Sequence, residues 1–170
     1  MQRVIYAILL LILTSCAGSG YVTRDAVQVI EDPYSDSIQY AGVTNTVEGT
    51  MGDLVGYNSF LRTWANKETG EVSHQLYIDI NYFNSDWIFF SHATFIGGTP
   101  AELTQINREV ITCTIGGCGY NEVVGIDFTT EELRSLTEGT SLKLYSESGY
   151  EEIVEIRPDQ VNAQLATIKN

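Results

Sequence analysis

The feature that most constrains this chain is an alternation of apolar and polar residues with a period of two. It is clearest between Val72 and Phe83, where one face carries Val72, His74, Leu76, Ile78, Ile80 and Tyr82. A period of two is the spacing of a β-strand with one face against a core. Similar segments, separated by turn-forming residues, are 37–47, 60–65, 87–95, 109–113, 120–128, 141–146 and 150–156. The chain is therefore predicted to be mainly β, as an antiparallel β-sandwich or an open barrel.

Three hairpins are expected from the turns between these segments. The first joins 60–65 to 72–83, and another joins 141–146 to 150–156. A third is centred on Ser85 and pairs the residues Tyr82 with Ile88, Ile80 with Phe90, and Ile78 with His92. This register places His74 and His92 on the core face as neutral, hydrogen-bonded side chains. On the other face, Phe83 and Trp87 lie near Asp79 and Asn81. This face is either a sugar- or peptide-binding surface or, as we favour, one covered by another layer.

Two helices interrupt the strand pattern. Thr129, followed three residues later by Glu132, is typical of a helical capping box, which predicts a short internal helix. Pro158 suits the first position of a C-terminal helix. Its apolar residues recur at helical spacing at Val161, Leu165 and Ile168. A helix this short is marginal in water alone, so we expect it to dock on the sandwich. The alternative is that the apolar stripe is free and captures a partner as an amphipathic helix in a groove.

The amino terminus has the features of an export signal. Arg3 is followed by an apolar run from Val4 to Leu13. As a helix this run spans roughly 15 Å, about half of the hydrocarbon core of a bilayer, which is too short for a transmembrane anchor. The run ends in Leu13-Thr14-Ser15-Cys16, which resembles the lipobox of bacterial lipoproteins. The resemblance covers residues 1–16 only, and the mature domain is not assigned to a family.

The lipobox resemblance implies an address and a division of the chain. In that family the cysteine is acylated and the peptide is cut before it, so Cys16 becomes the lipidated residue and holds the protein in a membrane. Ala17, in place of the Asp that marks inner-membrane retention in the family, favours the outer membrane. The expected organisation is a signal peptide at 1–15, a lipidated tether at 16–25 and a single β-rich domain at 26–170.

The charge of the mature chain limits its partners. Removing residues 1–15 takes away Arg3 and no acidic residue, so the formal net charge changes from −13 to −14. Such a surface repels nucleic-acid phosphates, and nucleic-acid binding is not expected. The remaining candidates for a partner, besides the membrane reached through Cys16, are a neutral or cationic envelope protein or a glycan.

Two cysteines, Cys113 and Cys118, flank a glycine-rich turn. Beyond the inner membrane the compartment is oxidising, so a pair this close predicts a disulfide. A metal site is the alternative, but it needs further ligands, and His74 and His92 are distant in the sequence. We expect no metal and no cofactor.

One carboxylate pair is a candidate for chemistry. If Cys113 opposes Cys118, then Glu109 faces Glu122 on the same hairpin, with Cβ atoms about 5 Å apart. Such a pair suits a retaining glycosidase or a Ca²⁺ ion. The alternatives are that both side chains splay into water, or that Arg108 or Arg134 neutralises one of them.

Three classes of function stay open. The first is a non-catalytic binding or structural module of the envelope, which is favoured because no nucleophile elbow, zinc-protease, phosphate-loop or EF-hand motif is present. The second is a carbohydrate-active hydrolase using Glu109 and Glu122. The third is an inhibitor of a cationic enzyme, similar in general type to the periplasmic lysozyme inhibitors. The segment Ser148-Gly149-Tyr150 does not continue into their Ser-Gly-x-x-Tyr pattern, so none of their site residues is carried over.

Overall fold

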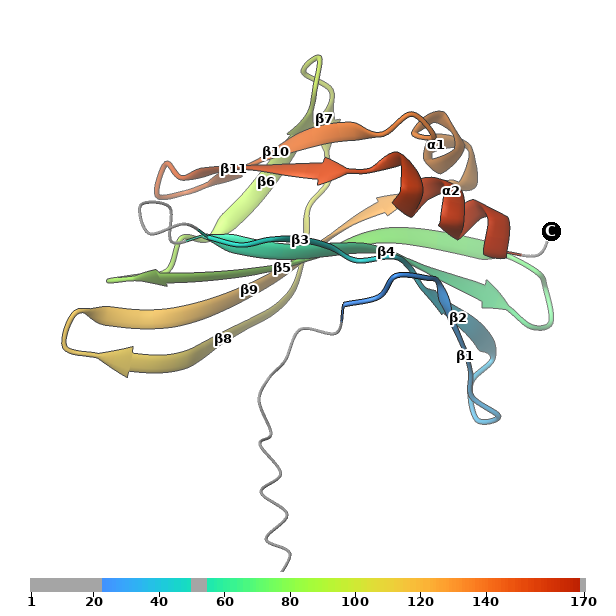
Figure 1. Ribbon diagram of the computed structural model, residues 1–170, viewed down its shortest axis with the longest axis horizontal. Helices are drawn as coiled ribbons and strands as arrows, with labels where there is room; N and C mark the ends of the chain where they lie inside the picture. Colours follow the sequence, from blue (N-terminus) through green and yellow to red (C-terminus); the bar gives the residue numbers. More distant parts are fainter. Residues whose placement is uncertain (1–22, 50–54, 169–170) are drawn as a thin grey trace, which may run out of the picture.

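Two antiparallel sheets and two short helices make up the computed structural model, which describes residues 23–49 and 55–168 (Figure 1). The predicted antiparallel, mainly β architecture with one internal and one C-terminal helix is confirmed. The segment expected to be a signal peptide, 1–15, and Cys16 lie outside the described residues. In Figure 1 the smaller sheet and both helices lie on one side of the larger sheet, and the chain from residue 23 to the first strand lies on its other side.

The larger sheet has seven strands, in the order β1-β2-β4-β5-β9-β8 with β3 also paired to β4. Their bounds are β1 Gln28–Glu31, β2 Ser37–Ala41, β3 Asn45–Val47, β4 Gly56–Asn66, β5 Val72–Asn84, β8 Thr104–Thr114 and β9 Gly117–Phe128. The smaller sheet has the order β11-β10-β6-β7, formed by β6 Phe90–Phe95, β7 Pro100–Ala101, β10 Thr140–Ser146 and β11 Glu151–Ile156. The helices are α1 Thr130–Ser135 and α2 Pro158–Thr167.

The core lies between the two sheets. The fully buried apolar side chains come from alternate positions of β4, β5, β9, β10 and β11, including Leu61, Leu76, Ile78, Val124, Leu144 and Val154. Each full burial of such a side chain contributes about 1.5–3 kcal/mol, so this apolar layer is the main source of stability. The period of two therefore fixes which face of β4, β5 and β9 is turned inward, and which residues remain on the outer face.

The hairpin expected about Ser85 is wrong. β5 pairs with β4 and β9, whereas β6 pairs with β10 and β7 in the other sheet. Phe89 has a φ of 60°, a left-handed conformation that is rare for an aromatic residue, at the point where the chain passes from one sheet to the other. This crossing keeps Ile88 and Phe90 buried but leaves His92 exposed, so the expected core position of His92 is also wrong.

Several other local predictions are confirmed, whereas the segment 37–47, expected as one strand, forms β2 and β3. β4 and β5, and β10 and β11, form the expected hairpins. Thr129 caps α1 and forms the capping box with Glu132. His74 is buried, and its ring nitrogens lie 2.8 Å from the Thr63 hydroxyl and 3.0 Å from the Thr130 hydroxyl. Burial lowers the pKa of His74, which favours the neutral ring expected in a core.

Helix α2 docks on the sandwich, as its short apolar stripe required. Val161 is fully buried and Leu165 packs against the core. The docked face also carries two fully buried glutamines that the stripe did not reveal. Gln160 donates to the carbonyls of Val43 and Ser59, and Gln164 donates to the Thr63 hydroxyl. Gln160 thereby ties helix α2 to the β2–β3 connection and to β4, and Gln164 ties it to β4.

Candidate functional site: a groove on the outer face of the larger sheet

Cys113 and Cys118 form a disulfide, as predicted. They occupy directly opposed positions at the ends of β8 and β9. The bridge therefore fastens the tip of the hairpin that forms one edge of the larger sheet.

The register of this hairpin separates the two candidate carboxylates. Arg108, not Glu109, pairs with Glu122, and Glu109 pairs with Asn121. The difference arises because β8 has an irregularity between Val110 and Thr112, and a shift of one residue moves every side chain to the other face of the sheet. Glu122 consequently points into the sandwich, whereas Glu109 is exposed on the outer face.

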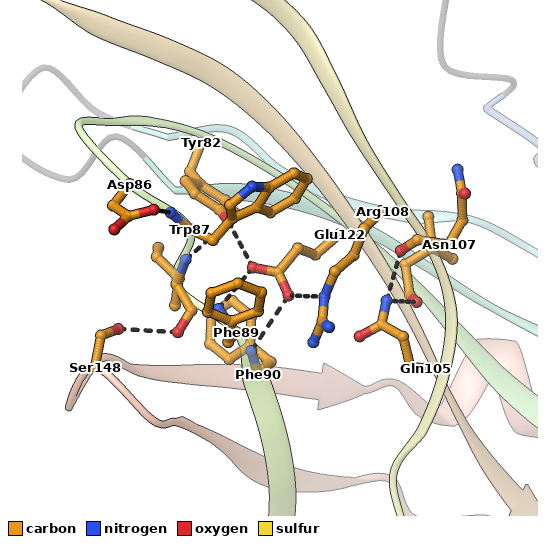
Figure 2. Close-up of polar contacts among 12 residues, drawn as sticks. Tyr82, Asp86, Trp87, Phe89, Phe90, Gln105, Asn107, Arg108, Glu122 and Ser148 are labelled. Carbon is orange, nitrogen blue, oxygen red and sulfur yellow. Dashed lines mark hydrogen bonds and ion pairs between the residues drawn. The ribbon is translucent and has the colours of Figure 1, made fainter.

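Glu122 is fully buried in a cluster of hydrogen-bond donors, shown in Figure 2. Its carboxylate accepts hydrogen bonds from the Tyr82 hydroxyl, from the backbone N–H groups of Phe89 and Phe90 at 2.9 and 3.3 Å, and from Arg108 Nε at 3.0 Å. The sequence offered Arg108 or Arg134 as the residue that neutralises one carboxylate of the pair. Arg108 forms this ion pair, with Glu122. The carboxylate joins β9 to the segment that crosses between the sheets.

Tyr82 completes this cluster as a neutral donor. Burial, followed by its hydrogen bond to Glu122, raises the pKa of Tyr82 far above the ordinary value for tyrosine. Its hydroxyl also accepts a bond from the N–H of Ile88 at 3.0 Å. Because a glycosidase needs two carboxyl groups facing one substrate, a buried Glu122 and an outward Glu109 do not form such a pair.

The outer face of the larger sheet is hollowed into a groove of about 950 Å³. Its floor is made by outward residues of three neighbouring strands. They are Asn58, Phe60 and Arg62 of β4, Tyr77, Asp79 and Asn81 of β5, and Asn121 and Val123 of β9. Arg24 and Ile30 contribute from the amino-terminal side, and Asn107 and Glu109 from β8.

A row of amide and carboxylate groups crosses this floor. The Asn81 Nδ2 donates to Asp79 Oδ1 at 3.0 Å, and Asn121 Nδ2 donates to the same carboxylate oxygen and to Asn81 Oδ1. Asn58, on the next strand, accepts a bond from the Thr46 hydroxyl at 2.6 Å. Side chains of neighbouring strands lie in rows because their Cβ atoms are about 5 Å apart. The row holds the polar groups in fixed orientations across the groove.

Two arginines lie over the aromatic residues of the groove. Arg24 Cζ lies 4.5 Å from the ring centroid of Phe60, and Arg62 Cζ lies 4.7 Å from that of Tyr77. The two rings are 4.9 Å apart. The guanidinium groups therefore cover aromatic faces and place positive charge in the groove.

Arg24 is the least satisfied residue of the groove. Its backbone is fixed by reciprocal bonds with Thr44, from Arg24 N to Thr44 Oγ1 at 3.2 Å and from Thr44 N to Arg24 O at 2.9 Å. Its Nε and Nη1 atoms are buried and have no hydrogen-bond acceptor in the described part of the chain. A buried, unsatisfied donor costs about 1–3 kcal/mol, and more when it is charged. The guanidinium must turn toward the groove before an acceptor outside the chain can reach these two atoms.

The other residues singled out from the sequence lie elsewhere. His92 stacks on Tyr145 with ring centroids 4.9 Å apart. Trp87 packs against Tyr120 and Phe89, whereas Phe83 pairs with Gly119 across the sheet and is exposed. The face of β5 that carries Phe83, Asp79 and Asn81 borders the open groove, so the covering layer that we favoured for this face is wrong. Within residues 23–49 and 55–168, no three His, Cys, Asp or Glu side chains cluster as metal ligands would. Nor does this part of the chain contain a helix of the length and apolarity needed to cross a membrane.

Comparisons with known proteins gave no match to a protein-family model, to a curated protein or to a solved structure. The class defined by the geometry is thus a two-sheet antiparallel β-protein with a polar groove on the outer face of its larger sheet.

Only part of the groove could be predicted from the sequence. Asp79 and Asn81 were expected to share the outward face of one strand. Arg24, Asn58 and Asn121 were missed because they come from separate segments. The available signal was the polar residues at alternate positions of β4 and β9, opposite their core residues.

Proposed function

We propose that this chain is a lipid-anchored binding module of the bacterial cell envelope, held in a membrane through Cys16, and that it takes its ligand in the outer-face groove. The observation that carries the binding role is Arg24, a fixed cation with two buried donors lacking an acceptor at the edge of a groove of about 950 Å³. The anchoring rests on the lipobox at Leu13-Thr14-Ser15-Cys16, and the choice of the outer membrane on Ala17.

The position of the groove along the chain supports the same proposal. Arg24 follows Cys16 by eight residues, which span at most about 30 Å when fully extended. A ligand held by Arg24 therefore lies within about that distance of the anchored cysteine. The disulfide agrees with an oxidising compartment outside the inner membrane.

The groove supports binding rather than hydrolysis. Asp79 already accepts hydrogen bonds from Asn81 and Asn121, and the second carboxylate of the groove, Glu109, comes from a different strand and is exposed. Asp79 is thereby held as an acceptor in a fixed network. This arrangement orients a ligand and offers no activated nucleophile.

Vesicle co-sedimentation tests the binding role. The full-length lipidated protein, reconstituted into phosphatidylcholine vesicles, is mixed with isolated envelope fragments depleted of the native protein. We expect the vesicles to sediment with the fragments, and Arg24→Gln to reduce this at least tenfold, because the unpartnered cation is lost. Lys143→Gln is the matched control, since Lys143 lies on β10 and pairs with Glu151, away from the groove. The proposal would be contradicted if vesicles carrying Arg24→Gln sedimented with the fragments as well as those carrying the wild type, or if the wild-type vesicles did not sediment with them.

A further inference from the structure

The floor of the groove presents mainly side chains. β5 lies between β4 and β9, β9 lies between β5 and β8, and β4 pairs with β2 and β3 on its other side, so most of their backbone N–H and C=O groups are already used in the sheet. An extended peptide gains most of its affinity by adding a strand to a free edge, and the edge strands β1 and β8 lie at the sides of the groove rather than in its floor. A ligand that lies on the floor therefore meets side-chain amides.

The polar row suits a ligand rich in hydroxyl and acetamido groups. Asn121 uses its amide hydrogens on Asp79 and Asn81, and the Asn58 oxygen accepts from Thr46. The groups left for a ligand are the second amide hydrogen of Asn81, the Asn58 amide hydrogens and the remaining lone pairs of the row, which still include both donors and acceptors. The aromatic faces of Phe60 and Tyr77 are covered by guanidinium groups, which leaves little apolar floor for an acyl chain. Sugars match this mixture of donors and acceptors better than lipids do.

The charge of the groove departs from that of the whole protein. The chain carries a formal net charge of −13, yet the groove contains Arg24 and Arg62 against Asp79 and Glu109. Asp79 is engaged by two asparagines, and Arg62 donates from Nε to Gln75 at 2.9 Å. Arg24 is left with donors that have no acceptor in the described residues. An ionised oxygen is the strongest acceptor for such donors.

We propose that the groove binds a carboxylate-bearing glycan, with the carboxylate on Arg24 and the hydroxyl or acetamido groups on the row formed by Asn58, Asp79, Asn81 and Asn121. This inference rests on the proposed function and adds the chemical class of the ligand. A neutral glycan and an acidic peptide are the competing ligands, and each gives a different experimental result.

Calorimetric titration of the full-length protein in detergent micelles separates these ligands. The first probe is the disaccharide of N-acetylglucosamine and N-acetylmuramic acid, which carries a carboxylate. The second is neutral di-N-acetylchitobiose, and the third is an acidic tripeptide. We expect the acidic sugar to bind at least tenfold more tightly than the neutral one, and the tripeptide to bind more weakly than the acidic sugar.

Two variants assign the roles of the groove residues. Arg24→Gln is expected to remove the preference for the acidic sugar, whereas Asn81→Ala is expected to weaken both sugars. Lys143→Gln should change neither affinity, and thermal melts of all three variants report whether the fold is retained. Equal affinity for the two sugars, tighter binding of the tripeptide, or no binding of the acidic sugar would overturn the assignment. If vesicles still sediment with envelope in an Arg24-dependent manner while the acidic sugar does not bind, the glycan assignment fails and the binding role stands.

Discussion

Replacing Glu122 with alanine is expected to lower the free energy of unfolding by about 3–5 kcal/mol, a cost typical of breaking a buried, hydrogen-bonded charge cluster by removing one member. The side chain is fully buried and accepts bonds from Arg108, from Tyr82 and from the backbone of Phe89 and Phe90. Its loss leaves these donors facing a cavity. Because Phe89 adopts a left-handed backbone conformation where the chain passes between the sheets, the link between the sheets should weaken as well.

The matched control is Glu109→Ala on the same hairpin. Glu109 is exposed and lies on the other face of the sheet, so its replacement should change the free energy of unfolding by no more than about 0.5 kcal/mol. Denaturant unfolding followed by circular dichroism measures both variants. Similar effects of the two substitutions would mean that Glu122 does not join the strands as described.

Substituting Cys16 with serine is expected to move the protein completely from the membrane to the soluble fraction. The proposed anchor is the set of acyl chains on this cysteine, and several chains bind a bilayer far more firmly than the single chain that binds reversibly. Fractionation of cells, together with labelling by radioactive palmitate, measures the effect. The control is the double variant Cys113→Ser and Cys118→Ser, which removes the disulfide and should remain membrane-bound and labelled. A Cys16→Ser protein that still incorporates palmitate would refute the anchor.

The local parts of the fold were predictable from the sequence because they depend on neighbouring residues. The alternation from Val72 to Phe83, the turn at 66–70 and the capping box at Thr129 each specify a short element. The pairing of β5 was not predictable in this way. Its partners are β4 and β9. In the sequence, β9 is separated from β5 by β6 and β7, which belong to the other sheet, and by β8. Turn residues such as Asn84-Ser85-Asp86 mark a change of direction without showing which sheet receives the next strand.

The site was less predictable than the fold. Arg108, and not the expected Glu109, lies opposite Glu122 because β8 has an irregularity that the apolar pattern does not reveal. Arg24 reaches the groove only because its backbone bonds to Thr44 and its guanidinium stacks on Phe60. Such contacts join segments that are distant along the chain, and no local pattern encodes them.

Hydroxyl-radical footprinting of the vesicle-bound protein, with and without isolated envelope fragments, tests most directly whether the outer-face groove is the binding surface. Phe60 and Tyr77 lie in the groove, and Tyr34 and Tyr150 are exposed in turns outside it. Binding in the groove predicts that envelope fragments reduce the oxidation of Phe60 and Tyr77 several-fold and leave Tyr34 and Tyr150 unchanged. Unchanged oxidation of Phe60 and Tyr77, or protection confined to Tyr150, would contradict the account.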